Sequence, residues 1–308
     1  MKIVQRMPIV FILASLLLQS CASAPLQPTP TRLELPAPIL ATQTSAPEPS
    51  TRTPVPATPS ETPWQPTFER PSPQPTLEST PTPDPIRRTP ATLMLHRPND
   101  QFDAVQFLKE FIAILQQNEM EVVTYQRLVK RPDLPVVKPG KLFIITIDDI
   151  YLRYPIDPGV LEMINLLVEA GYPAVLGVVT ESDYAYPETV ETLRKLQAIG
   201  WEIASHSDTH RNLAKVEKIA PKSIYPEIKA SLDKIEKALD LRPITLILPE
   251  GQMTRGDEQI KRSGVLWVIG INGGTQYDTR EPYHYLGREG PDGNAQNTFA
   301  IMYKRFNP

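Results

Sequence analysis

Residues 93–308 predict an α/β domain in which helices cover a mainly parallel sheet. Along this part of the chain, amphipathic helical stripes alternate with short apolar runs, the order expected of repeated strand–helix units. The run Ala174–Val179 is apolar throughout, as in a strand that is covered on both faces. Roughly 215 residues are enough for one well-filled domain. Periodicity alone does not decide between a closed barrel and an open sheet.

Capping residues and apolar spacing place the individual elements. Asp157 precedes a proline at the first helical position, and Gly171 follows the last turn, so a helix is expected between them. The same criteria predict helices over 102–117, 187–200, 223–239 and 257–263. Strands are expected over 121–124, 142–146, 174–179, 201–204, 244–248, 265–271 and 299–303.

The first twenty residues have the pattern of an export signal. Lys2 and Arg6 precede the apolar stretch Ile9–Leu18, which is too short to span a bilayer comfortably. The following Leu18-Gln19-Ser20-Cys21 resembles the lipobox of bacterial lipoproteins, which implies cleavage before Cys21 and lipidation of its thiol. An ordinary secretory signal is the alternative. Cys21 is the only cysteine, so no internal disulfide can use it. We therefore expect an extracytoplasmic protein anchored to a bacterial membrane by its N-terminal lipid.

Residues 21–92 are expected to form a disordered tether. Of the 35 prolines in the chain, 19 lie between Pro25 and Pro90, mixed mainly with Thr, Ser, Ala and Gln. Such a segment buries too little apolar area to offset the entropy lost on ordering. Proline favours extended polyproline II, so the segment would hold the domain away from the membrane. The net charge is −3, and without a basic cluster no nucleic-acid partner is expected.

Two polar segments follow expected strands and carry the chemistry. Asp148 and Asp149 end the first, and His206 and His210 frame the second. The carboxyl ends of parallel strands are where α/β folds build their sites. Asp149 and the two imidazoles supply three ligands for a divalent cation, and Asp148 is left to act as a base. Taken singly, each segment could be an ordinary polar loop.

These motifs resemble those of the polysaccharide deacetylases, the NodB-homology or carbohydrate esterase 4 family. The resemblance rests on three segments: Thr146-Ile147-Asp148-Asp149-Ile150, His206-Ser207-Asp208-Thr209-His210 followed by Asn212-Leu213, and Met94-Leu95-His96. It implies an incomplete (β/α) barrel that removes N-acetyl groups from a GlcNAc-containing polysaccharide, such as peptidoglycan or poly-N-acetylglucosamine. It also implies Asp148 as the base and Asp149, His206 and His210 as ligands of a divalent metal, zinc.

The later family motifs are altered. Pro249-Glu250-Gly251 stands where a Pro-Tyr-Gly turn is usual, so the Glu250 backbone N–H is the candidate oxyanion donor. The motif arginine, which orients the base, has no counterpart at Leu246 or Ile247. Arg255 is expected to be an exposed arginine at a helix start, with a substitute for the motif arginine as the alternative. Ile150 replaces a glycine. The family's Leu-x-His is absent, and His284 is the nearest candidate for the general acid, with a surface loop histidine as the alternative.

Several residues also have non-catalytic interpretations. His96 is expected to be a structural histidine near the barrel floor, with a substrate contact as the alternative. Trp201 and Trp267 are expected in the core, and Gly273-Gly274 in a loop. Two other functions stay open: a degenerate domain that binds metal and glycan without efficient hydrolysis, and an esterase that removes O-acetyl groups from polysaccharide.

Overall fold

The computed structural model describes residues 90–306 except 253, 255, 272–277 and 281–282, and leaves the side chains of 136 and 278–280 undescribed. The expected signal peptide, Cys21 and the tether up to residue 89 lie outside the described residues, as do Arg255 and Gly273-Gly274. Among the helices that are described, none is both long and apolar enough to cross a membrane.

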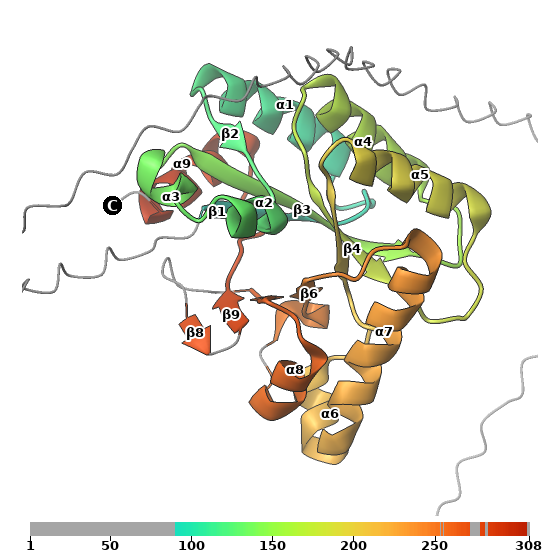
Figure 1. Ribbon diagram of the computed structural model, residues 1–308. Coiled ribbons are helices and arrows are strands. Elements are labelled where there is room, and N and C mark those ends of the chain that lie inside the picture. The colour runs from blue at the N-terminus through green and yellow to red at the C-terminus, as the bar shows by residue number, and fades with distance from the viewer. Residues whose placement is uncertain (1–89, 253, 255, 272–277, 281–282, 307–308) are drawn as a thin grey trace, which may run out of the picture. The chain divides into compact units, whose positions relative to one another are not determined.

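One sheet organises the domain, as Figure 1 shows. Its strand order is β1-β3-β4-β5-β6-β7-β9-β8, and the short β2 pairs with β3. Seven strands from β1 to β9 are parallel along this path, and β8 is antiparallel to β9. The strands are β1 Ala91–Leu95, β2 Glu121–Val122, β3 Leu142–Tyr151, β4 Val175–Val179, β5 Glu202–Ser205, β6 Thr245–Ile247, β7 Trp267–Ile269, β8 Asp278–Arg280 and β9 Tyr283–Leu286.

The two ends of the parallel path meet at one point. Leu93 of β1 forms an isolated parallel bridge with Glu289, three residues beyond β9. The Met94 N–H donates to the Glu289 carbonyl at 2.8 Å, and the Glu289 N–H donates to the Thr92 carbonyl at 2.9 Å. The fold is therefore the incomplete barrel that the family resemblance implies, with a narrow contact between its first and last parallel strands.

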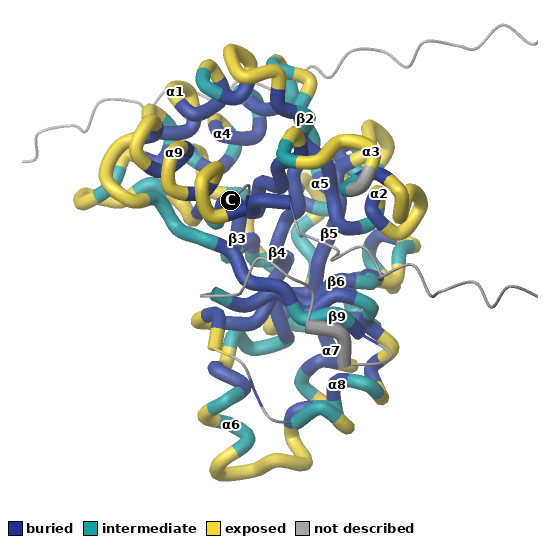
Figure 2. The backbone as a smooth tube through the Cα atoms, turned by 90° about the vertical axis from the view of Figure 1, so that its left-hand side faces the viewer, coloured by how far each residue is buried: buried dark blue, intermediate teal, exposed yellow. Residues whose placement is uncertain are grey.

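Helices cover the outside of the sheet (Figure 1). The apolar faces of most helices pack on the outward residues of the strands, whereas α2 and α3 pack on inward residues such as Leu142 and Ile144. Helix α1 lies beside both α4 and α9. The tube in Figure 2 is buried along the central strands and exposed on the outer turns of the helices. The helices are α1 Ala104–Gln117, α2 Tyr125–Lys130, α3 Leu134–Val137, α4 Pro158–Glu169, α5 Pro187–Ala198, α6 Leu213–Ile219, α7 Ile224–Leu239, α8 Asp257–Ser263 and α9 Ala295–Phe306, with 3-10 turns η1 Pro221–Ser223 and η2 Pro249–Gly251.

The alternation of side chains along β3 determines which of its residues face the barrel interior. Phe143 and Ile145 pack outward under the helices, whereas Leu142 and Ile144 pack inward against residues of β4 to β9. Because alternate residues of a strand share a face, Asp148 points inward with Ile144. The same period makes Glu202 and His206 inward-facing at opposite ends of β5.

Most expected elements are present, and one has the wrong type. The Asp157 carboxylate caps α4 by accepting from the Gly159 N–H at 2.9 Å, as predicted. The strand expected over 299–303 is instead part of helix α9. Its buried residues, among them Phe299, Met302 and Phe306, recur at helical spacing, which the short aromatic run concealed. Strands β1 and β9 were not predicted, and β1 begins at Ala91, two residues before the expected domain start.

Candidate metal centre

Asp149, His206 and His210 converge at the carboxyl end of the strands. One potential ligand atom from each of these residues lies within 4.8 Å of those of the other two. The Asp149 Oδ1 atom is 3.0 Å from His210 Nε2 and 3.4 Å from His206 Nε2. The two Nε2 atoms are 3.2 Å apart. The structure therefore brings together the three residues that the sequence identifies as metal ligands.

An irregularity in β3 lets two neighbouring aspartates approach one site. The pairing register between β3 and β4 shifts between Ile147 and Ile150, which is a bulge-like break in the alternation. Asp149 within this break has a φ of 62°, in the left-handed region that few side chains favour. As a result His206 Nε2 lies 3.9 Å from Asp148 Oδ2 as well as 3.4 Å from Asp149 Oδ1.

The tautomer of His206 is set by the neighbouring strand. Its Nδ1 lies 2.9 Å from the Ile247 carbonyl oxygen of β6, which can only accept a hydrogen bond. Nδ1 therefore carries a proton, and in the neutral ring the Nε2 lone pair faces the cluster. His206 is 1% exposed, so the ring is held by packing as well as by this bond. This is the arrangement that a metal-binding histidine requires.

The residues present fit a divalent cation. Asp149 Oδ1 is buried and has no hydrogen-bond partner, yet it faces two imidazole nitrogens. A cation held by these residues would give the carboxylate oxygen and the two ring nitrogens a common partner. Burial raises the pKa of Asp149, but the adjacent imidazoles lower it by more, so the pKa lies far below its usual range. Two nitrogens and one carboxylate form the donor set of a catalytic zinc-like site.

Asp148 is held by an arginine that sequence reasoning missed. Arg288 Nη1 donates to Asp148 Oδ1 at 2.7 Å, and Arg288 Nη2 donates to Asp148 Oδ2 at 2.6 Å. Both side chains are 1% exposed. Arg288 also donates to the Thr146 hydroxyl at 2.8 Å. Burial raises the pKa of Asp148, but Arg288 and then His206 outweigh it and hold the pKa below its ordinary range.

Arg288 reaches this position through the register of the last strand. Leu286 of β9 packs inward, and Arg288 lies two residues further on, on the same face. An arginine two residues after an inward-facing strand residue is the sequence pattern that could have identified Arg288. Because β9 was not predicted, this pattern was not recognised. Arg288 thus supplies a guanidinium beside Asp148, which neither Leu246 nor Ile247 can do.

His96 lies at the site rather than at the barrel floor. It follows β1, whose last pairs with β3 are Met94 with Thr146 and Leu95 with Ile147. His96 is thus level with Asp148, and its Nε2 is 3.8 Å from Asp148 Oδ2. The side chain is 45% exposed, so the ring is accessible from solvent while it lies beside Asp148. The expectation of a structural floor histidine is wrong because β1 was not predicted and its direction was unknown.

The structure does not bring His284 to the cluster. His284 is in register with Trp267, the first residue of β7, and the two rings pack with centroids 4.9 Å apart. It precedes Arg288, which lies two residues beyond β9, by four residues, or about 13 Å of extended chain. His284 therefore lies toward the amino-terminal ends of the strands and not beside Asp148, so its expected role as general acid stays a prediction that this position does not favour. Trp267 and Trp201 are buried, as predicted.

Glu250 lies in the turn after β6, where its carboxylate is paired with polar and cationic side chains. Its φ is 54°, a left-handed conformation within η2. The carboxylate accepts from Asn212 Nδ2 at 2.7 Å and from Lys215 Nζ at 3.0 Å. Hydrogen bonds from Asn212 and then Lys215 lower the pKa of Glu250. These contacts offset the negative charge that the sequence places near the site.

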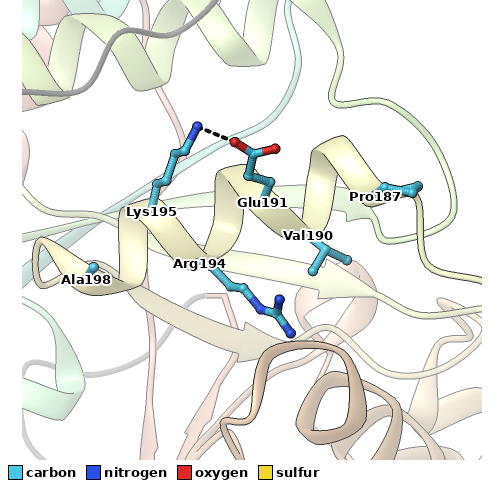
Figure 3. A pocket seen from close by; sticks show the side chains of 6 residues that line it. All are labelled: Pro187, Val190, Glu191, Arg194, Lys195 and Ala198. Atoms are coloured by element: carbon cyan, nitrogen blue, oxygen red, sulfur yellow. Dashed lines mark ion pairs between the residues drawn. The ribbon is translucent and has the colours of Figure 1, made fainter.

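A shallow depression lies along the outer face of α5, as Figure 3 shows. Pro187, Val190 and Arg194 line it, beside the ion pair between Glu191 and Lys195. None of its lining residues belongs to the metal cluster. The depression therefore adds nothing to the chemistry of the site.

Comparisons with known proteins agree with this geometry. The family model named Polysaccharide deacetylase matches residues 136–264, which confirms the resemblance read from the motifs. A comparison with curated proteins gave no significant match.

Solved structures share the fold. IcaB from Ammonifex degensii is similar with a TM-score of 0.56 and 17% identity, over 70% of this chain and 97% of that one. The Streptococcus pyogenes deacetylase PplD, in complex with acetate, gives 0.55 and 16%, over 71% and 98%. A de-N-acetylase from Aggregatibacter actinomycetemcomitans gives 0.50 and 18%, over 64% and 93%. At these identities the likeness shows the fold alone.

Proposed function

We propose that this chain, whose residues 136–264 belong to the polysaccharide deacetylase family, is a metal-dependent hydrolase that removes N-acetyl groups from a GlcNAc-containing polysaccharide of a bacterial wall or surface. One observation carries the proposal. A buried carboxylate, Asp148, is held by Arg288 beside a separate cluster of Asp149, His206 and His210. A hydrolase of this kind needs a base that is not itself consumed as a metal ligand.

Asp149, His206 and His210 are the residues that would hold the metal. A bound divalent cation would polarise the acetamide carbonyl and make a water molecule more acidic. The partly exposed ring of His96 lies 3.8 Å from Asp148, next to these ligands. Zinc is the proposed metal because imidazole nitrogen and carboxylate oxygen are its usual ligands in catalytic sites.

The protein's own residues divide the proton transfers between them. Asp148 accepts the proton of the attacking water, and it is ionised for this task because Arg288 keeps its pKa low. Attack on the acetyl carbon and loss of the amine break the C–N bond, and the leaving nitrogen needs a proton. His96 is the proposed donor, since its solvent-accessible ring lies next to Asp148. The Glu250 backbone N–H is the proposed oxyanion donor.

The alternative is a degenerate, non-catalytic domain, which the altered turn, Ile150 and the absent Leu-x-His motif favour. Two contacts of Asp148 count against it. Arg288 supplies a guanidinium to the base from another part of the chain. His96 likewise offers an imidazole where His284 does not.

Acetate release from defined substrates tests the proposal. The full-length protein, supplied with zinc, would be assayed on acetylated chitooligosaccharides, peptidoglycan and poly-N-acetylglucosamine. We expect the wild type to release acetate and Asp148→Asn to bind zinc but release none. Glycan binding without acetate release would instead establish the non-catalytic domain. Release only from O-acetylated polysaccharide would establish the esterase.

The proposed location is extracytoplasmic, anchored to a bacterial membrane by lipid on Cys21, with the proline-rich segment as tether and the domain facing the cell surface or periplasm. The lipobox-like residues before Cys21 support this proposal. Metabolic labelling with a fatty acid, followed by membrane fractionation, tests it. Label that persists in Cys21→Ser, or a wild type recovered wholly in the soluble fraction, contradicts it.

A further inference from the structure

Helix α7 carries a polar stripe that faces the segment between the two histidines. Glu227, Ser231 and Lys234 are spaced by four and three residues, so they share one face of the helix. Each of them hydrogen-bonds to a different residue of the segment 205–209. The helix is 16 residues long, and its apolar residues Ile228, Leu232 and Ile235 anchor it in the core.

Glu227 binds the residue immediately before His210. One carboxylate oxygen, Oε1, accepts from the Thr209 backbone N–H at 2.6 Å and from the Thr209 hydroxyl at 2.8 Å. Both bonds end on the same oxygen atom. A side chain that offers one acceptor oxygen at this position can therefore replace the carboxylate.

Ser231 begins a relay of hydrogen bonds that ends on His210. The fully buried Ser231 accepts from the Ser205 hydroxyl at 2.9 Å, and Ser205 Oγ accepts from the Ser207 N–H at 3.2 Å. The Ser207 hydroxyl then accepts from the His210 N–H at 3.1 Å. The backbone on both sides of the segment is thus tied to α7.

Lys234 holds the middle of the segment through Asp208. Its ammonium donates to Asp208 Oδ1 at 2.8 Å, and the Thr180 hydroxyl donates to the same oxygen at 2.6 Å. The Lys234 and Asp208 side chains are 22% and 15% exposed, so water screens this pair less than a surface pair. Asp208 thereby links α7 to the end of β4.

The segment needs such support because its backbone is strained. Ser207 and His210 have φ values of 64° and 55°, in the left-handed region. Residues other than glycine adopt this region at a cost and keep it only where their surroundings enforce it. The His206 ring is already oriented by Ile247. His210 is the ligand whose position depends most on α7.

We propose that Glu227, Ser231 and Lys234 are positioning residues that set the metal affinity of the site by holding His210 in place. The proposal rests on the metal site of the proposed function. Losing a hydrogen bond of the stripe lets the segment 207–210 relax toward unstrained conformations, and His210 must then be reordered each time a metal binds. Partners that orient metal ligands commonly change affinity by about 10- to 100-fold when removed.

The proposal is tested by measuring the zinc affinity of the full-length apo protein in competition with a chromophoric chelator. Far-UV circular dichroism and thermal unfolding of the same apo samples report folding separately. We expect Glu227→Met to weaken zinc binding by about 10-fold or more, and Lys234→Met to weaken it in the same direction. Glu227→Gln should bind nearly as the wild type does, because one amide oxygen can accept both bonds from Thr209. Lys237→Met, an exposed position on the same helix, is the matched control and should not change the affinity.

Ser231→Ala keeps the proposal testable if the Glu227 or Lys234 variants do not fold, because this substitution removes one buried hydroxyl and no charge. It should also weaken zinc binding while the apo protein stays folded. Wild-type affinity in folded Glu227→Met, Lys234→Met and Ser231→Ala would overturn the proposal, as would equal losses in Lys237→Met. A wild type that binds no zinc would instead refute the metal site, and this inference with it.

Discussion

Arg288 and Asp148 form a buried pair with two hydrogen bonds of 2.7 and 2.6 Å, although 140 residues separate them. The pair joins the end of the last parallel strand to the end of β3. It therefore makes the geometry of the proposed base depend on closure between the first and last strands of the barrel. The Glu289 bridge to β1 is one residue away from it.

Replacing Arg288 with methionine should reduce both activity and stability. Asp148 would be left as a buried unpaired carboxylate, which costs roughly 3 to 5 kcal/mol when the partner of a buried pair is lost. We expect kcat to fall by at least about 100-fold, the usual contribution of a positioned base. Urea unfolding and acetate release measure the two effects.

The double variant Asp148→Asn/Arg288→Met serves as the control for this prediction. Its unfolding free energy should exceed that of Arg288→Met, because no charge is left unpaired in the interior. If the double variant and Arg288→Met are equally stable, the unpaired Asp148 carboxylate is not the cause of the loss of stability.

Replacing His96 with glutamine should reduce kcat while zinc affinity is unchanged. His96 faces Asp148 at 3.8 Å but does not belong to the three-residue cluster. A lost proton donor lowers the rate by about 100-fold or more. His284→Gln provides the comparison, since that ring packs on Trp267 away from the cluster. The reverse outcome, with His284→Gln inactive and His96→Gln active, would return the acid role to His284.

Replacing Gly177 with alanine should disturb the base selectively. A Cβ atom at this position of β4 would lie 3.2 Å from Asp148 Oδ1 and 3.4 Å from Asp148 Cα. The contact is tighter than usual, so the carboxylate must shift by a few tenths of an ångström against Arg288. We expect kcat to fall while zinc affinity is retained, as measured by acetate release and chelator competition. Unchanged kcat would show that the carboxylate has room to move.

Glu202 should make the stability of the protein depend on pH near neutrality. This carboxyl lies at the inner start of β5 and accepts from the Gln126 N–H at 2.7 Å and the Thr245 hydroxyl at 2.5 Å. Burial raises its pKa to about 7, against the lowering effect of these hydrogen bonds. In the unfolded chain its pKa is about 4.3. Its stabilising contribution is therefore complete below about pH 4.3 and is lost as pH rises through about 7.

The variant Glu202→Gln isolates this contribution. Glutamine stays neutral, so its unfolding free energy should fall less between pH 5 and 8 than that of the wild type. The difference between the two proteins should change by about 3 kcal/mol at most over this range. Urea unfolding at several pH values, with a chelator present in all samples, measures it. Parallel pH profiles would contradict the prediction.

Local pattern was enough to predict most elements and the position of both motifs. The caps of α4, the apolar runs of β3 and β4 and the stripe of α7 are each encoded within about 16 residues or fewer. Because parallel strands end at one edge of a sheet, Asp149 could be expected near His206 before their distance was known. Where local pattern was ambiguous, as at Phe299, a helix was mistaken for a strand.

The sequence by itself determined most of the central strands and helices, the two polar motifs and the family they resemble. Only the tertiary structure decided which residues surround them. Arg288 and His96 reach Asp148 through strand register across a barrel, and Glu227 and Lys234 reach the histidine segment from the face of a separate helix. Such contacts depend on how distant segments are aligned along the sheet, and a shift of one residue would turn each side chain to the opposite face. Local periodicity contains no information about that alignment.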